Sequence, residues 1–209
     1  MGGRLAQTPS INSRSLGVAY ILMGAFLLIY PWIASPFWAV QIGAQAFILG
    51  MIALSLTFLA GYGGMVSLAQ LSVAGCAGYM VAIWGFNDAK MGMGWPWIPT
   101  VLMAITIAVI FGTLIGIISV RTEGIYTIMI TLAISVGFYY FVRQNYPIFN
   151  GWSGLAGLKP PVLGGVNMRD PVPFYYLCLG VAAIVYAAAV YLGRTSFGLS
   201  LQGIRDNDR

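Results

Sequence analysis

Apolar residues form long continuous runs along this chain and do not alternate with polar ones. A transmembrane β-barrel alternates apolar and polar positions in segments of about ten residues, whereas a helical span is a continuous apolar run of about twenty. The pattern therefore predicts an all-α, polytopic integral membrane protein, a helical bundle with about six transmembrane helices. The predicted spans cover residues 16–34, 38–60, 65–86, 98–120, 125–142 and 174–192.

The polar segments at the two ends of the chain set the predicted domain organisation. The leader "MGGRLAQTPSINSRS" precedes an apolar run, 16–34, that is longer than the apolar stretch of about 7–15 residues in a signal peptide. We therefore expect a retained first helix. The chain divides into a cytoplasmic leader (1–15), a transmembrane domain (16–192) and a polar cytoplasmic segment (193–209).

Composition supports the membrane class. The chain is 59% hydrophobic and 7% charged, with a mean hydropathy of +0.86, whereas soluble domains carry about 25% charged residues. Its net charge of +5 does not indicate a nucleic-acid partner, because the charges lie between the apolar runs and do not form one patch. We expect the surroundings to be membrane lipid. The two cysteines, Cys76 and Cys178, lie within apolar runs and are interpreted as packing residues, with no disulfide and no metal site.

The loops predict an orientation. With both ends in the cytoplasm, the inner segments carry six basic residues (Arg4, Arg14, Arg121, Arg194, Arg205 and Arg209) and the outer loops carry four (Lys90, Arg143, Lys159 and Arg169). Membrane proteins place more Lys and Arg inside, and they place aromatic rings at the interfaces. The aromatic segments 95–97 and 174–176 then lie at the outer interface, which favours a cytoplasmic N-terminus.

Ionisable residues are missing from the centres of all six predicted spans. Ion-coupled carriers keep such groups at membrane depth, and a hydrolase needs a nucleophile with a base or a metal. The chain also lacks the Gly-x-x-x-x-Gly-Lys-[Ser/Thr] loop that binds nucleotide phosphates. We therefore expect no catalytic residues and no cofactor in this chain, and any energy must come from a partner.

Small and weakly polar residues crowd the stretch "GYGGMVSLAQLSVAGCAGYM", residues 61–80. Three glycines in four residues disfavour a smooth helix, and irregular backbone at membrane depth requires protein or a water-filled cavity around it. One interpretation places a helix break here beside a translocation path. The other assigns the glycines to helix packing, as in "GTLIG" (112–116), and Gln70 to a bond with a neighbouring helix. The candidate path and break residues are Gly61, Gly64, Ser67, Gln70, Gly75 and Gly78.

The same stretch resembles the signature of the branched-chain amino acid ABC transporter permeases of the LivM type, A-G-x-x-G-x-x-S-L-G-[His/Gln]-x-x-F-x-G-x-G-A-Y. The matching residues are Ala60, Gly61, Gly64, Ser67, Leu68, Gln70, Gly75 and Tyr79. Ala69 and Val73 stand where Gly and Phe are usual, and both remain small or apolar. Residues 120–140, "VRTEGIYTIMITLAISVGFYY", are similar to a second family segment, with Arg121, Gly124, Tyr126, Thr131, Leu132 and Ala133 in place.

A third similarity lies at the C-terminus. Residues 193–209, "GRTSFGLSLQGIRDNDR", resemble the family's cytoplasmic loop that docks onto the ATPase. The resemblance assigns coupling to Gly198, Ile204, Arg205, Asp206, Asn207 and Asp208. Without it, the mixed charges of this segment are typical of a solvated flank of the membrane. Family members continue beyond this loop with further helices, so we expect this coupling loop to be truncated and the chain to be an N-terminal portion.

The resemblance implies a permease subunit of an ATP-binding-cassette importer for branched-chain amino acids or similar small polar solutes, in the bacterial inner membrane. Its implied partners are a second, LivH-like permease subunit, two ATP-binding subunits that bind the ATP, and an extracytoplasmic substrate-binding protein. Two alternatives stay open. One is a channel or facilitator that needs no ATPase, and the other is a structural membrane protein without a pathway.

Overall fold

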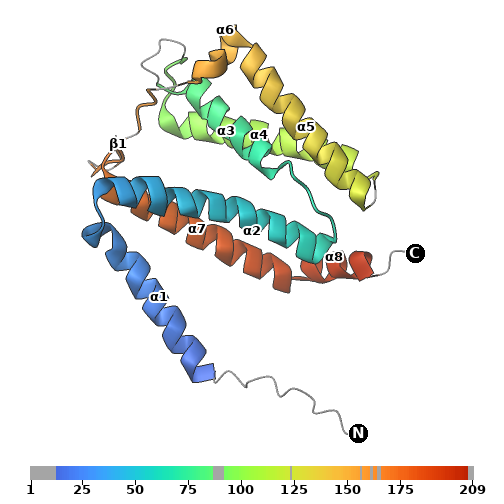
Figure 1. Cartoon of the computed structure of the whole chain (residues 1–209), viewed down its shortest axis with the longest axis horizontal. Coiled ribbons are helices and arrows are strands. Elements are labelled where there is room, and N and C mark those ends of the chain that lie inside the picture. The colour runs from blue at the N-terminus through green and yellow to red at the C-terminus, as the bar shows by residue number, and fades with distance from the viewer. Residues whose placement is uncertain are drawn as a thin grey trace, which may run out of the picture.

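The computed structural model (Figure 1) describes residues 13–86, 92–122, 124–155, 157–160, 162–163 and 166–206. Helices occupy all six predicted apolar ranges, which confirms the all-α membrane class. They are α1 (Ser13–Ile33), the π-helical η1 (Trp38–Ala44) continued by α2 (Gln45–Gly63), α3 (Gln70–Trp84), α4 (Trp97–Ser119), α5 (Ile125–Gln144) and α7 (Pro171–Arg194). The shorter elements are α6 (Tyr146–Phe149), the 3₁₀ turn η2 (Gly151–Ser153), α8 (Ser196–Asp206), and β1 (Val162–Leu163) paired antiparallel with β2 (Val166–Asn167).

Four of the helical segments are long and apolar enough to cross a membrane: Trp38–Gly63, Trp97–Ser119, Ile125–Gln144 and Pro171–Arg194. The apolar parts described in the other two, Ile21–Ile33 and Gln70–Trp84, are shorter. The predicted third span, 65–86, is helical only over the 15 residues of α3. The residues before α3, 65–69, are non-helical backbone. The total of six crossings stays a prediction.

The helices alternate in direction, so the connections gather at two ends of the molecule (Figure 1). The end of α2, the turn between α4 and α5, and α8 lie at one end. The short helix α6 and the β1–β2 pair lie at the other. The α4–α5 turn and α8, which are both predicted to face the cytoplasm, thus share one end.

Helix α3 packs closely on α4 through small residues. Ala104 and Ala108 are buried on α4, and a Cβ added to Gly112 would lie 3.7 Å from the Val73 side chain of α3. These three α4 residues are spaced four apart, so they share one face. Without a hydrophobic driving force in lipid, close van der Waals contact across small residues is what holds such helices together. Cys76 and Cys178 are buried and carry no disulfide.

A proline in α1 explains how α1 and α7 are joined. Pro31 has no N–H, so the carbonyl of Leu27, four residues earlier, has no donor within the helix. The hydroxyl of Tyr175, whose side chain is buried, donates to this carbonyl at 2.9 Å. The Tyr176 hydroxyl donates to the next carbonyl, of Leu28, at 2.7 Å. Two tyrosines at the start of α7 therefore satisfy backbone groups near the proline.

Candidate translocation and coupling site

Helix α2 ends at a glycine in the left-handed conformation. Gly64 has φ +66° and follows Gly63, the last helical residue. A side chain there would be strained by the positive φ, and its Cβ would lie 2.6 Å from Cγ of Arg205. Gly61 lies in the last turn of α2, and a Cβ there would meet nothing within 4 Å. Only one of the two glycines is therefore required by backbone geometry.

Residues 64–69 connect α2 to α3 as non-helical backbone, and their polar groups need partners in an apolar surrounding. The N–H of Leu68 donates to Oγ1 of Thr131 on α5 at 3.1 Å. Oγ of Ser135, one turn further, lies 3.1 Å from the carbonyl oxygen of Leu68. The N–H of Ala69 donates to Oγ of Ser67 at 3.3 Å. Hydroxyl groups therefore replace the helical hydrogen bonds that this segment lacks.

The hydroxyls on α5 form a row with a spacing of four residues: Thr127, Thr131 and Ser135. The first two are buried, and Thr131 is 0% exposed. Each of the last two also lies within hydrogen-bond distance of the carbonyl four residues back, at 2.9 and 2.8 Å. From the sequence, Thr131 was noted only as a residue that matches the family segment, and Thr127 and Ser135 were not noted. The four-residue spacing on one face of an apolar helix was the signal that could have identified them.

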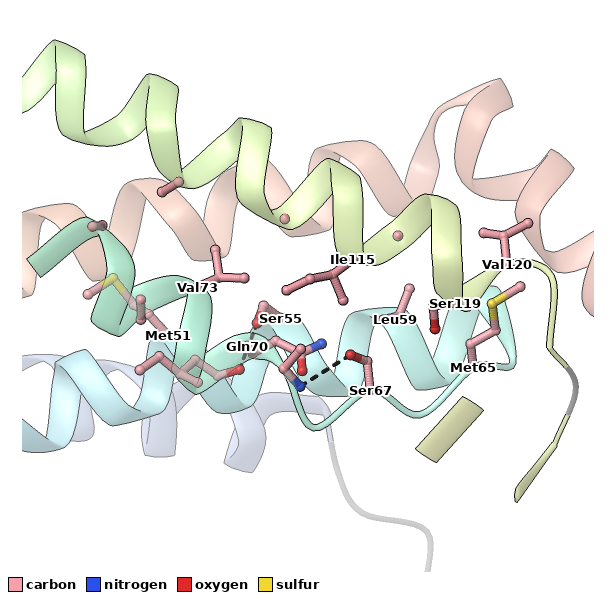
Figure 2. Close-up of a pocket in the computed structure, with 17 residues that line it drawn as sticks. Met51, Ser55, Leu59, Met65, Ser67, Gln70, Val73, Ile115, Ser119 and Val120 are labelled. Carbon is pink, nitrogen blue, oxygen red and sulfur yellow. Dashed lines mark hydrogen bonds between the residues drawn. The ribbon is translucent and has the colours of Figure 1, made fainter. Parts of the chain in front are cut away.

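A cavity of about 450 Å³ lies between the 64–69 segment and helices α2, α3 and α4 (Figure 2). Its wall is mostly apolar, with Met51, Leu59, Val73 and Ile115 among the lining residues. The polar side chains on the wall are Ser55, Ser67, Gln70 and Ser119. An apolar cavity with a few polar groups is the usual form of a small-molecule site.

Gln70 stands out within this cavity. Its Oε1 atom is buried and has no hydrogen-bond partner among the described residues. Gln70 is also the first residue of α3, directly after the non-helical segment. A buried amide oxygen without a donor costs free energy of about 1–3 kcal/mol. This oxygen is an acceptor that a donor on a bound solute could satisfy.

The six candidate path residues fall in three places. Ser67 and Gln70 line the cavity. Gly61 and Gly64 lie outside its lining and contact Arg205. Gly75 lines a groove between α3 and α5, and both Gly75 and Gly78 line a shallow depression beside Ser153, Gly154, Leu155 and Leu158. The glycines of α3 therefore line other surfaces than Ser67 and Gln70, which line the cavity.

Helix α8 packs tightly against the ends of α7 and α2. A Cβ on the buried Gly198 would collide with the carbonyl oxygens of Leu192 and Gly193. A Cβ on Gly193 would collide with the hydroxyl of Tyr62 from α2. Two glycines therefore allow three chain segments to meet at this end of the molecule. Gly198 is one of the residues that the resemblance assigned to coupling.

Arg205 connects α8 to the break. Its guanidinium donates from Nη1 to the carbonyl of Gly61, and its aliphatic stem lies over Gly64. Of the other candidate coupling residues, Ile204 and Asp206 belong to α8, while Asn207 and Asp208 lie outside the described residues. α8 is amphipathic, so one face can pack on the protein while the other remains polar.

Within the part of the chain that the structure describes, no three His, Cys, Asp or Glu residues come close enough to hold a metal ion. The site instead offers a cavity with an unpaired acceptor, a segment of non-helical backbone, and an amphipathic helix bonded to the start of that segment. A cavity of this kind can hold a small molecule.

These features define a multi-pass helical membrane protein. The chain belongs to the family of branched-chain amino acid transport system permease components, whose model matches residues 38–209. No curated protein and no solved structure matches the chain. Membership makes it a transport permease component of the membrane, and it favours a transport subunit over an enzyme.

Proposed function

We propose that this chain is the membrane-spanning permease subunit of an ATP-binding-cassette importer for branched-chain amino acids or similar small polar solutes. A second permease subunit completes the pathway, and two ATP-binding subunits dock on the cytoplasmic side. An extracytoplasmic binding protein delivers the solute. The protein lies in the bacterial inner membrane with its N-terminus in the cytoplasm.

The observation that carries this proposal is the contact of Arg205 with the end of α2. α8 belongs to the segment that resembles the family's ATPase-docking loop, and its Arg205 bonds Gly61 and covers Gly64. The next residues form the non-helical segment that reaches the cavity at Ser67. A movement of α8 imposed by a partner would therefore act directly on the left-handed glycine. A few residues that absorb a backbone change are what a hinge requires.

The chemistry of the cavity suits an aliphatic amino acid. The unpaired Oε1 of Gln70 can accept a hydrogen bond from an ammonium group, and the side chains of Ser67 and Ser119 also line the cavity. The apolar majority of the lining suits a branched aliphatic side chain. We assign the cavity to the solute on these grounds.

The test is reconstitution of the protein, expressed from its full coding sequence, in liposomes with the permease, ATPases and binding protein encoded beside it. We expect ATP hydrolysis that rises with leucine, isoleucine or valine, and uptake that stops without ATP. Uptake without ATPases would identify a channel or facilitator. Stable insertion with neither uptake nor ATPase binding would identify a structural protein.

A further inference from the structure

A groove of about 430 Å³ runs between α3 and α5, on a different face of α3 from the cavity. Apolar side chains line most of it, namely Leu68, Leu71, Leu132, Val136, Phe138 and Val142. Along α5 the lining extends from Leu132 to Arg143, a distance along the helix of about 16 Å. The groove is thus a long apolar channel on a helix that is long enough to cross a membrane.

One positive charge closes the groove at the end of α5. Arg143 lies in the last turn of α5, 3.4 Å from the ring centre of Trp152, and its guanidinium donates to the hydroxyl of Tyr139. The contacts of Arg143 within the described chain are with aromatic side chains, and no carboxylate neutralises it there. A guanidinium carries five N–H donors, so donors remain for an anion.

The position of this charge corresponds to the headgroup level of a bilayer. Trp152 is 80% exposed, and Tyr139, Tyr140 and Tyr146 are exposed around the same helix end. Aromatic rings gather at membrane interfaces, where their apolar bodies and polar tips are both accommodated. A phospholipid whose acyl chain lies in the groove would therefore have its phosphate near Arg143.

We propose that this groove is a binding site for one anionic phospholipid, with an acyl chain between α3 and α5 and the phosphate on Arg143. Guanidinium groups bind phosphate by paired, charge-assisted hydrogen bonds. A zwitterionic lipid carries its own cation, which competes for the phosphate, so an anionic headgroup is preferred. The groove does not suit an amino acid, because its lining along α5 extends over about 16 Å, far more than the length of such a solute.

The test measures lipid binding directly. The purified protein in detergent is titrated with phosphatidylglycerol or with phosphatidylcholine, and bound lipids are counted by native mass spectrometry. We expect a first phosphatidylglycerol to bind at least tenfold more tightly than phosphatidylcholine. Arg143→Gln should abolish this preference, and Arg143→Lys should keep part of it, because the charge is retained. Arg194→Gln, at the end of α7, is the matched control and should leave the preference unchanged.

A second pair of variants tests the groove itself. Val136→Trp fills the groove and should weaken the first phosphatidylglycerol about tenfold. Val109→Trp changes a similarly exposed valine of α4 outside the groove and should have no effect. Equal binding of the two lipids by the unmodified protein would overturn the proposal. So would a headgroup preference that survives both Arg143→Gln and Val136→Trp.

Discussion

Arg205 of α8 donates a hydrogen bond to the carbonyl of Gly61 in the last turn of α2, 144 residues earlier in the chain. The last four carbonyls of a helix have no partner within it, and the negative end of the helix dipole favours a cation. Arg205 therefore caps α2 from a distant segment. The same side chain covers Gly64, where the non-helical segment begins.

Replacing Arg205 should separate ATP hydrolysis from transport. In the reconstituted transporter, Arg205→Gln should lower solute uptake at least tenfold, while basal ATP hydrolysis by the partner subunits persists. The reason is that α8 then moves without acting on α2. Arg194→Gln removes a cation from the neighbouring end of α7 and serves as the control, with uptake within about twofold of the unmodified protein. Equal losses in both variants would mean that only the general charge of this end matters.

Gly64 and Gly61 form a second test, because they differ in backbone conformation and in surrounding space. Gly64→Ala should lower the free energy of unfolding by about 1–3 kcal/mol, since the alanine is held at φ +66° against the Arg205 stem. Gly61→Ala, in open space within the helix, should be neutral or slightly stabilising. Thermal unfolding in detergent measures both. Similar melting temperatures for the two variants would contradict the capping geometry described above.

The sequence predicted most of the fold because spans of apolar residues have few alternatives in a membrane. One of the two interpretations of residues 61–80 placed a helix break at the glycine cluster, and α2 does end at Gly63. The sequence could not place the start of α3 at Gln70. That position depends on Thr131 and Ser135, which hold the non-helical backbone from another helix. Tertiary hydrogen bonds of this kind leave only a weak trace in a linear pattern.

Which candidate residues share a surface could be predicted only in part, and their role in a translocation path stays a prediction. Ser67 and Gln70 follow the glycines closely in sequence, and both line the cavity. Gly75 and Gly78 share their helix, but helical rotation turns them toward other surfaces. The contact of Arg205 with Gly61 joins the segment 193–209 to the stretch 61–80, which the sequence analysis treated as two separate motifs. Only the folded path of the chain brings them together.

Removing the hydroxyl of Thr131 should destabilise the non-helical segment. Thr131→Val keeps the shape of the side chain but leaves the N–H of Leu68 without an acceptor, which costs about 1–3 kcal/mol. Thr113→Val is the control, because Oγ1 of Thr113 bonds only the carbonyl of Val109 in its own helix. Hydrogen exchange of residues 64–69, followed by mass spectrometry, should accelerate in the first variant only. Unchanged exchange in Thr131→Val would show that α5 does not hold this segment.

Cysteine labelling tests whether the cavity belongs to a path for solute. Cys76 and Cys178 are first replaced by alanine, and single cysteines are then introduced at Ser67 and Gln70. A small membrane-impermeant thiol reagent should label both in at least one transport state, and leucine should slow the reaction. A cysteine at Val109, exposed on α4 outside the cavity, is the control and should remain unlabelled in lipid. No labelling at position 67 or 70 in any state would exclude them from the path.

The bond between Tyr175 and Leu27 allows the role of Pro31 to be measured by a double-mutant cycle. Tyr175→Phe removes the hydroxyl that satisfies the Leu27 carbonyl and should cost about 1–2 kcal/mol of stability. Pro31→Ala restores an N–H four residues after that carbonyl, so the same Tyr175→Phe change should cost less in the Pro31→Ala background. Tyr186→Phe, on an exposed part of α7, should cost nothing in either background. Additive effects of Tyr175→Phe and Pro31→Ala on thermal unfolding would show that the tyrosine bond does not depend on the proline.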